Sequence, residues 1–461
     1  MAEPPNEDKT NYMTYDDVSE WLEANAIGEV SCLVPDFGGT ARGKSMTPAL
    51  FLTGLRNGSL RLPEATYAVG AHGDFIFNDH IDRSERDLVL QCDLNTIHVT
   101  PWTKENAAAI ICDGIRTDGT PFPLSPRQVL KDVLALYDKQ GWKPIVGPEI
   151  EFYLIAPFED IIRKPNAPRG SGGLREFGQY TYSLDAIDEF DEFFEDLYDF
   201  SKLQNIQLDT LIHEDGPCQF EVNLGHTDAL TIADQLFLFK RLARHVGKKH
   251  GMFVTFMAKP YAEESGSSIH THQSVVDTKT GKNIFANEDG SDSQLFSYYI
   301  GGLQKHLPEA MPFIAPYTNS YNRFEAYMSA PTNTHWGREN RTVGLRVPDS
   351  TPSARRIENR IAGSDINPYF AITASLICGY IGMMEKVERE EEFKGQSYDD
   401  NQNMLPGTLT NALDKFRKSD TLRKYLGDAV IDTFADVKQA EYDDRSSVLS
   451  PWDVQYLMVN N

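Results

Sequence analysis

Two glutamates at alternate positions of an apolar stretch are the first candidates for chemistry in this chain. Residues 146–154 are typical of a strand, in which successive side chains point to opposite faces. Glu149 and Glu151 therefore share one face, and Ile150 and Phe152 are expected to pack on the other. Two carboxylates this close repel each other, so we expect cations between or beyond them.

Three later stretches repeat this pattern of polar side chains on one strand face. In residues 213–223 a Gly-Pro turn separates Glu214 from a strand that carries Glu221. The other two stretches place these side chains together: His270, His272 and Ser274, and then Arg356, Glu358 and Arg360. The five glutamates and one imidazole suit two divalent ions that prefer oxygen ligands, Mg²⁺ or Mn²⁺. The arginines suit bidentate binding of carboxylates and phosphates.

Each stretch also has an ordinary structural interpretation. A single strand histidine is commonly a satisfied core residue, and Arg-Ile-Glu-Asn-Arg at 356–360 resembles a surface ion-pair ladder. Four such strands within one chain are harder to explain as surface decoration. Together they favour a site that binds metal ions and phosphate.

Length, charge and cysteine content exclude several classes of protein. With 461 residues the chain is long enough for two or three domains, and its net charge of −24 argues against a nucleic-acid or anionic-membrane partner. Five scattered cysteines without CxxC spacing indicate a reducing compartment. The N-terminus lacks the apolar core of a signal peptide, and residues 369–384 predict a buried helix rather than a membrane span. We therefore expect a cytoplasmic protein.

A glycine-rich segment offers an alternative nucleotide site. Residues 38–45 match G-x-x-x-x-G-K-[ST], the pattern of a P-loop NTPase in which Lys44 and Ser45 reach the phosphates and Mg²⁺. However, Pro48 interrupts the helix that must start at the lysine, and the residues that follow lack the βαβ alternation of a parallel sheet. The competing interpretation is a hairpin turn.

The order of apolar segments predicts two domains. A helix is expected over residues 12–26 and a strand over 29–37, and short apolar runs between 70 and 122 are typical of a small β-rich domain. The Pro-rich segment 121–126 predicts a connector, which gives domains 1–122 and 123–461. A helix over 127–140 then leads into the strand of Glu149 and Glu151. Residues 164–180, rich in Pro and Gly, predict a loop over the site.

The motifs as a set resemble those of the glutamine synthetase family. The similarity runs from near residue 15 to the C-terminus, and its helical part at 409–448 also matches. The segments that carry it are Gly147-Pro148-Glu149-Ile150-Glu151-Phe152, the pair Glu214 and Glu221, Met257-Ala258-Lys259-Pro260, Gly266-Ser267-Ser268-Ile269-His270, Glu339-Asn340-Arg341-Thr342 with Arg346-Val347-Pro348, Arg355-Arg356-Ile357-Glu358 and Asn367-Pro368-Tyr369.

The resemblance implies a fold and an assembly. The implied fold class is α+β, with a small N-terminal β-grasp-like domain followed by a large catalytic domain that has a curved antiparallel sheet and flanking helices. A ring-shaped homo-oligomer is also implied, commonly a dodecamer with sites at the subunit interfaces.

The resemblance further implies ATP and two or more Mg²⁺ or Mn²⁺ ions per site. One metal would be held by Glu151, Glu214 and Glu221, and the other by Glu149, His270 and Glu358. The resemblance also implies residues that bind the substrates. Glutamate would be bound by Gly266, Arg323 and Arg360, ATP by His272 and Ser274, and the phosphates of ATP by Arg341 and Arg346. Arg341, Glu214 and Arg323 are the candidates for direct catalysis.

The implied reaction forms an amide. A γ-carboxylate of glutamate attacks the γ-phosphorus of ATP, and a nitrogen nucleophile then displaces phosphate from the acyl phosphate. That nucleophile must be unprotonated, so a carboxylate near the amine has to accept its proton. Glu214, Glu64 and Glu325 are the candidate acceptors.

The chain departs from the glutamine-forming members at positions that face ammonium, glutamate or ATP in those proteins. An Asp-Gly-Ser-Ser stretch of the N-terminal domain is replaced by residues 62–66, and the flap sequence Glu-Ala-Pro becomes Ser329-Ala330-Pro331. An Asn-Gly pair becomes Ser265-Gly266, and a lysine near ATP becomes Ser353. The loss of two carboxylates predicts a larger nucleophile, and hence a γ-glutamyl-amine ligase of the putrescine or polyamine type. An ordinary glutamine synthetase and a non-catalytic structural relative remain as alternatives.

Overall fold

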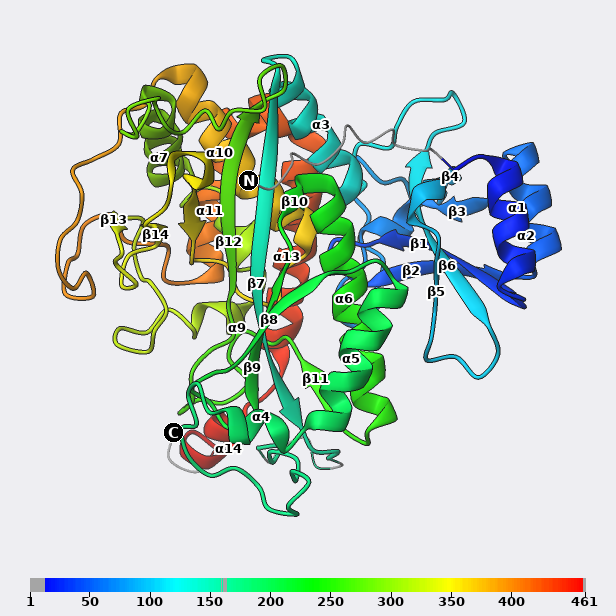
Figure 1. Cartoon of the computed structure of the whole chain (residues 1–461), viewed down its shortest axis with the longest axis horizontal. Coiled ribbons are helices and arrows are strands. Elements are labelled where there is room, and N and C mark those ends of the chain that lie inside the picture. The colour runs from blue at the N-terminus through cyan, green and yellow to red at the C-terminus, as the bar shows by residue number, and fades with distance from the viewer. Residues whose placement is uncertain (1–12, 159, 161–163, 459–461) are drawn as a thin grey trace, which may run out of the picture.

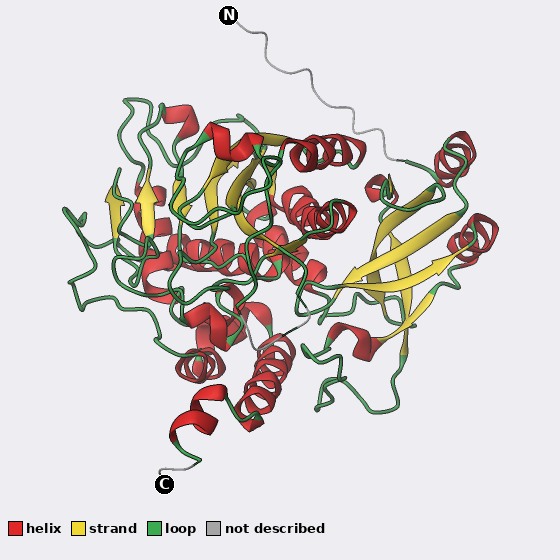
Figure 2. Cartoon of the chain, turned by 90° about the horizontal axis from the view of Figure 1, so that it is seen from below, coloured by secondary structure: helices red, strands yellow, loops and turns green. Residues whose placement is uncertain are grey.

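The computed structural model describes residues 13–158, 160 and 164–458. It contains a small sheet near the N-terminus and a large sheet farther along the chain (Figure 1). The small sheet lies at one end of the molecule with its two helices outermost, and other helices lie between the two sheets (Figure 2). The mixed α and β architecture agrees with the predicted fold class.

The small sheet has six strands within the described residues, in the order β2-β1-β6-β4-β3 with β5 beside β6. Strands β1 and β6 are parallel, and the other pairs are antiparallel. Helix α1 begins at a capping box in which the Thr14 hydroxyl accepts from the Asp17 backbone N–H. The bounds are α1 Tyr15–Ala24, β1 Glu29–Pro35, β2 Ala41–Met46, α2 Pro48–Asn57, β3 Arg61–Pro63, β4 Asp87–Cys92, β5 His98–Val99 and β6 Ala107–Ile115.

The structure excludes a P-loop at residues 38–45. Lys44 lies within strand β2, where it pairs with Cys32 of β1 in an antiparallel hairpin, and helix α2 starts only at Pro48. A P-loop requires its lysine at the start of a helix, so the P-loop alternative is wrong. The apolar run at 74–77 also forms no strand, only an isolated bridge between Val69 and Phe75.

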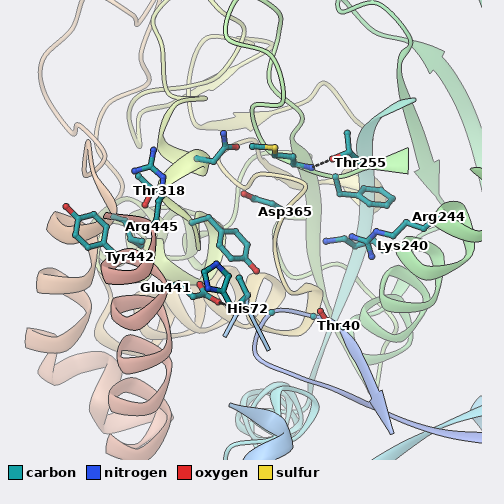
Figure 3. A pocket seen from close by; sticks show the side chains of 18 of the residues that line it. Thr40, His72, Lys240, Arg244, Thr255, Thr318, Asp365, Glu441, Tyr442 and Arg445 are labelled. Atoms are coloured by element: carbon teal, nitrogen blue, oxygen red, sulfur yellow. Dashed lines mark hydrogen bonds between the residues drawn. The ribbon is translucent and has the colours of Figure 1, made fainter. Parts of the chain in front are cut away.

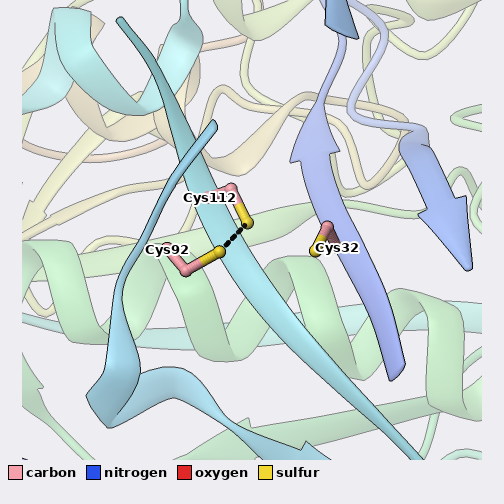
Figure 4. A group of neighbouring side chains, drawn as sticks. All are labelled: Cys32, Cys92 and Cys112. Carbon is pink, nitrogen blue, oxygen red and sulfur yellow. Dashed lines mark hydrogen bonds between the residues drawn. The ribbon is translucent and has the colours of Figure 1, made fainter. Parts of the chain in front are cut away.

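Three thiols meet inside the small sheet (Figure 4). Cys32, Cys92 and Cys112 come from strands β1, β4 and β6, and the Cys112 and Cys92 sulfurs are 3.1 Å apart. All three are buried and are free cysteines. Unpaired thiols behave as small apolar side chains, so this cluster forms part of the core of the sheet.

The large sheet has nine strands within the described residues, in the order β13-β14-β15-β12-β7-β9-β8, with β10 and β11 also beside β7. All pairs are antiparallel except β13 with β14. The central strands β7 and β12 run through the middle of the molecule (Figure 1). The bounds are β7 Trp142–Ile155, β8 Leu208–His213, β9 Gln219–Leu224, β10 Thr227–Asp228, β11 Phe253–Thr255, β12 Ile269–Asp277, β13 Trp336–Arg338, β14 Leu345–Val347 and β15 Ile357–Asn359.

Helices pack against the large sheet and join it to the small one. The most buried is α10, whose residues from Pro368 to Met383 are all buried, as predicted for 369–384. None of the helices in the described part of the chain is long and apolar enough to cross a bilayer. The bounds are α3 Pro126–Asp138, α4 Leu184–Asp188, α5 Asp191–Leu203, α6 Ala229–Lys249, α7 Gln294–His306, α8 Met311–Ile314, α9 Thr318–Tyr321, α10 Pro368–Glu385, α11 Leu409–Lys418, α12 Asp420–Leu426, α13 Asp428–Ser447 and α14 Pro451–Tyr456.

A buried arginine ties the two sheets together. Arg127, at the start of α3, donates to Asp113 of β6 at 2.8 Å and to both carboxylate oxygens of Asp234 in α6 at 2.9 Å. It also donates to Asp93, just after β4, at 2.6 Å. Removing one partner of such a buried network leaves uncompensated charge, so these contacts fix the small sheet against α6. The predicted domain boundary after residue 122 remains a prediction.

Candidate active site

Strand register brings the predicted polar residues together. In the ladder between β7 and β12, His270 lies opposite Glu149, and between β7 and β9, Glu221 lies opposite Glu151. Glu358 of β15 lies opposite His272. Directly opposed side chains on one face of a sheet are neighbours, so four separate strands of the sequence produce one cluster.

Three of the carboxylates form the first group that the resemblance implied. Oxygens of Glu151, Glu214 and Glu221 all lie within 4.8 Å of one another. The Glu151 carboxylate is held by Ser268, whose hydroxyl donates at 2.5 Å and whose backbone N–H donates at 2.8 Å. This orientation leaves the cluster facing a pocket rather than the core.

The second group differs in part from the one the resemblance implied. Glu149 lies within 4.8 Å of Glu221 and His270, and also within 4.8 Å of His272 and Glu358. The His270 Nδ1 is 3.2 Å from Glu149 and 3.8 Å from Glu358, so the three predicted residues are neighbours. His272, which was expected near ATP, joins them as a fourth.

The hydrogen bonds of His272 fix its tautomer. Arg356 Nε donates to His272 Nδ1 at 3.1 Å, so the ring proton is on Nε2, which donates to Glu149 Oε1 at 2.9 Å. An arginine therefore orients the imidazole, and the imidazole orients a carboxylate. Contacts of this kind behind a ligand set are typical of metal sites.

The electrostatics of the cluster call for added positive charge. Burial raises the pKa of Glu221 to about 10, with a further contribution from Glu149 and Glu151. Burial and the Glu151 carboxylate also raise the pKa of Glu214 to about 7. Carboxylates that share a site without cations resist ionisation. Oxygen ligands with one or two imidazoles fit Mg²⁺ or Mn²⁺, which would allow the carboxylates to ionise together.

Glu358 is compensated by arginines instead. Its two oxygens accept from Arg346, at 2.7 Å, and from Arg360. Although burial alone would raise the pKa of Glu358, Arg360 and His270 hold it at about 2. Glu358 is thus ionised at neutral pH, and its carboxylate holds the side chains of Arg346 and Arg360 beside the cluster.

Two pockets open on either side of the cluster. The larger, named here the carboxylate pocket, has a volume of about 480 Å³. The predicted site residues that line it are Glu149, Glu151, Glu214, Glu221, Gly266, His270, Arg323, Arg341, Arg346 and Arg360. The second, the histidine pocket, has about 420 Å³ and is lined by His272, Ser274, Ser353 and Arg356. Glu149 and Asn223 line both pockets.

The predicted proton acceptors separate in space. Glu214 lines the carboxylate pocket, whereas Glu325 is exposed and Glu64 is buried in the small sheet region after β3. Within the described residues, neither Glu64 nor Glu325 lines that pocket. The predicted loop at 164–180 contributes through Glu176, which contacts His213 at 3.1 Å behind the cluster.

Some residues of the site carried no assigned role from sequence. Ser268 holds Glu151, and Asp215 lines the carboxylate pocket, where it accepts a hydrogen bond from Thr181 at 2.6 Å. Ser268 was detectable only as the position two before His270. Asp215 follows Glu214 in a turn, where an acidic residue is usually solvated.

The comparisons with known proteins agree with this geometry. A family model described as the catalytic domain of glutamine synthetase matches residues 123–457. The chain belongs to the glutamine synthetase family. This confirms the predicted family, and the enzyme class that follows is ATP-dependent carbon–nitrogen ligase. Family members use ATP and divalent metals.

Two relatives span nearly the whole chain. The gamma-glutamylputrescine synthetase PuuA of Escherichia coli (strain K12) is 31% identical over 438 residues, which cover 94% of this chain and 92% of that protein. The glutamate–isopropylamine ligase of a Pseudomonas sp is 31% identical over 450 residues, covering 95% and 96%. The solved structure of apo GmaS without ligand superposes on this chain with a TM-score of 0.82 and 26% sequence identity. The match covers 96% of this chain and 99% of the GmaS chain.

Proposed function

We propose that this enzyme uses ATP to join the γ-carboxylate of glutamate to a primary amine through γ-glutamyl phosphate. The observation that carries the proposal is the convergence of the predicted carboxylates and histidines from β7, β9, β12 and β15 on one cluster between two pockets. Metal ions at such a cluster supply charge neutralisation for phosphoryl transfer.

The side chains suggest a role for each pocket. We assign ATP to the histidine pocket, with His272 and Ser274 as contacts, and glutamate to the carboxylate pocket, with Gly266, Arg323 and Arg360. Arg341 and Arg346 line the carboxylate pocket, where they would offset phosphate charge in the transition state. Glu149, Glu151, Glu214, Glu221, His270 and Glu358 are the proposed metal ligands, and His272 is a neighbour of the same carboxylates.

Glu214 is the strongest candidate to accept the amine proton. It lines the carboxylate pocket, and a general base functions best when its pKa lies near the working pH. Burial and Glu151 raise its pKa to about 7. Bound cations would lower this value, so the carboxylate would be ionised when the amine arrives.

The lining of the carboxylate pocket supports an amine larger than ammonium. Two positions that differ from the glutamine-forming members, Ser265 and Ser329, face this pocket. Apolar side chains that would accept an alkyl chain are also present, namely Ile212 and Met328. Amide formation with putrescine and with isopropylamine, named for the two relatives, falls within this substrate class.

We further propose a homo-oligomer, commonly a dodecamer in this family. Within the described residues, Glu64 lines neither pocket of its own subunit, so any role of Glu64 in the reaction would require a neighbouring copy to supply it.

An amine panel tests the proposed reaction. Purified enzyme with ATP, Mg²⁺ and glutamate is expected to show a higher kcat/KM for putrescine, spermidine or a short alkylamine than for ammonium. Ser329→Glu, which restores a carboxylate to the flap, is expected to lower kcat/KM for alkylamines relative to ammonium, and Ser329→Ala serves as its control. A preference for ammonium would identify an ordinary glutamine synthetase, and absence of turnover would identify a non-catalytic relative.

A further inference from the structure

A third cavity lies away from the candidate active site. It has a volume of about 540 Å³ and is bounded by α6, β11, α13 and the loops around Gly39 and His72 of the N-terminal region. Among the described residues, it shares no lining residue with the carboxylate or histidine pockets. We name it the α6–α13 cavity. Its volume is in the range of small-molecule sites.

The cavity contains cations that have no anionic partner. Arg244 stacks on the Phe256 ring at 5.2 Å, and neither Arg244 nor Arg445 forms an ion pair within the described residues. Of the anions of the cavity, Glu441 contacts Lys438 at 2.9 Å, whereas Asp365 accepts from Ser320 through Oδ2 and its Oδ1 is buried without a hydrogen-bond partner. Arg244 and Arg445 are therefore available to bind an anionic ligand in this cavity.

The charges are distributed in a definite order (Figure 3). Lys240 and Arg244 of α6 lie at one end, Tyr442 and Arg445 of α13 lie at the other, and Asp365 lies between them. A compact polyphosphate would bring several negative charges close to Asp365. A ligand with an anionic group at each end and a less charged middle reduces this repulsion, and the ring of Phe256 offers an apolar wall at the Arg244 end.

We propose that the α6–α13 cavity is a second ligand site, specific for small dicarboxylates whose two anionic groups are bound by Arg244 and Arg445. Arginine suits this role because its planar guanidinium binds a carboxylate through two parallel hydrogen bonds. Lys240 adds a further cation at the Arg244 end. Burial, with a smaller contribution from Arg244, lowers its pKa to about 7, and a bound anion would hold it charged.

The cavity is connected to the active site through one short segment. Lys240 Nζ donates to the carbonyl oxygens of Ser364, at 2.8 Å, and Ile366, at 2.7 Å. The Ser364 hydroxyl lies 2.6 Å from the carbonyl oxygens of Glu151 and Ser268 and can donate its one proton to either of them. A ligand that draws Lys240 toward the cavity therefore acts on the strands that hold a proposed metal ligand, and we expect it to change kcat/KM.

Binding to the full-length enzyme tests the site. Isothermal titration with succinate and glutarate is expected to show saturable binding that weakens by about tenfold or more in Arg244→Gln and in Arg445→Gln. The matched control is Arg83→Gln, because Arg83 is an exposed arginine that also stacks on a phenylalanine. Butyrate and inorganic phosphate, which lack two separated anionic groups, are expected to bind more weakly.

The glutamate site also attracts carboxylates, so the two sites have to be separated. Binding at the cavity is expected to persist in Arg360→Gln, which alters the proposed glutamate contact. Dicarboxylate binding that is lost in Arg360→Gln but retained in the Arg244→Gln/Arg445→Gln double variant would overturn the proposal, as would the absence of saturable binding. Equal binding of phosphate would overturn the assignment to dicarboxylates.

Activity assays test the connection. Glutarate is expected to change kcat/KM for glutamate in the wild type and in Arg83→Gln, and to lose the part of its effect that arises at the cavity in Arg244→Gln. In Ser364→Ala, binding is expected to remain while this effect disappears. An effect of equal size in Arg244→Gln would show simple competition at the glutamate site, and an effect retained in Ser364→Ala would overturn the route through Ser364.

Discussion

The carboxylate pocket and the α6–α13 cavity have opposite charge imbalances. The first contains buried carboxylates that the chain leaves without enough cations, with the pKa of Glu221 raised to about 10. The second contains two arginines that form no ion pair within the described residues. In each case the chain omits a counter-charge it could have supplied. The sign of the missing charge indicates the sign of the ligand, with cations expected at the first site and anions at the second.

The largest expected effect comes from removing one carboxylate of the crowded cluster. Glu221→Gln keeps the shape of the side chain but removes a proposed metal ligand, so kcat is expected to fall by more than about a hundredfold. Because the pKa of Glu221 is raised to about 10, the metal-free protein must take up a proton there when it folds at neutral pH; glutamine removes this cost, so the Tm is expected to rise. Steady-state kinetics, Mn²⁺ titration and thermal unfolding without metal measure the three quantities.

The control for that experiment is Glu288→Gln, because Glu288 is exposed and, among the residues that the structure describes, forms an ion pair only with Lys282. Activity, Mn²⁺ affinity and Tm are all expected to stay at their wild-type values. Unchanged Mn²⁺ affinity in Glu221→Gln would contradict the comparison of the two sites, because the excess of carboxylates in the carboxylate pocket would then not serve to bind cations.

An intermediate effect is expected in the pH dependence of stability. The pKa of Glu214 is raised from 4.5 to about 7 in the fold, so its stabilising contribution is present below pH 4.5 and is lost as pH rises through 7. The difference corresponds to about 3 kcal/mol at most. Without metal, the free energy of unfolding is therefore expected to decline across this range.

Divalent cations are expected to reverse that decline, because they favour the ionised carboxylate. Chemical denaturation at pH 5, 6, 7 and 8, with Mg²⁺ and with a chelator, measures both curves. Glu214→Gln removes one titrating group and is expected to make the metal-free curve less steep over this range, with the remaining decline due to Glu221, whose pKa is raised to about 10. A metal-free curve of equal slope in wild type and Glu214→Gln would contradict the assignment.

The smallest effect is expected at a cation that belongs to neither site. Lys44 is exposed on strand β2, and only the match of residues 38–45 to a P-loop pattern suggested that it binds phosphate. Lys44→Ala is expected to leave kcat and the KM for ATP close to wild type, as measured by steady-state kinetics. A large rise in the KM for ATP would mean that Lys44 contacts the nucleotide, which would contradict its assignment to a solvated hairpin strand.

The active-site cluster was predictable because strand geometry is local. Alternation placed Glu149 beside Glu151 and His270 beside His272, and the structure then aligned these pairs across neighbouring strands. The motifs also predicted different roles for the two histidines, with His270 on a metal and His272 near ATP. In the structure, however, His272 Nε2 lies only 2.9 Å from Glu149 Oε1, closer than a role at ATP implied. Register between distant strands, which sets such distances, is not encoded in any one segment.

The α6–α13 cavity illustrates what sequence could not provide. Arg244 and Arg445 are 201 positions apart, and each reads as an ordinary solvated residue of its own helix. Only the packing of α13 beside the N-terminal loops brings them to one cavity. The pattern at 38–45 failed for a related reason, because the motif specifies residue types and the hairpin of β1 and β2 is decided by pairing across the sheet.

Glu149 forms part of the wall of both the carboxylate and the histidine pockets. A cation bound to this one side chain would therefore be shared between the glutamate and nucleotide chambers. Binding of a substrate in either pocket changes the electrostatic potential in the other. The apparent affinity for glutamate should therefore depend on the ATP concentration, and the apparent affinity for ATP on the glutamate concentration. The enzyme is thereby expected to show substrate synergism without any movement of its domains.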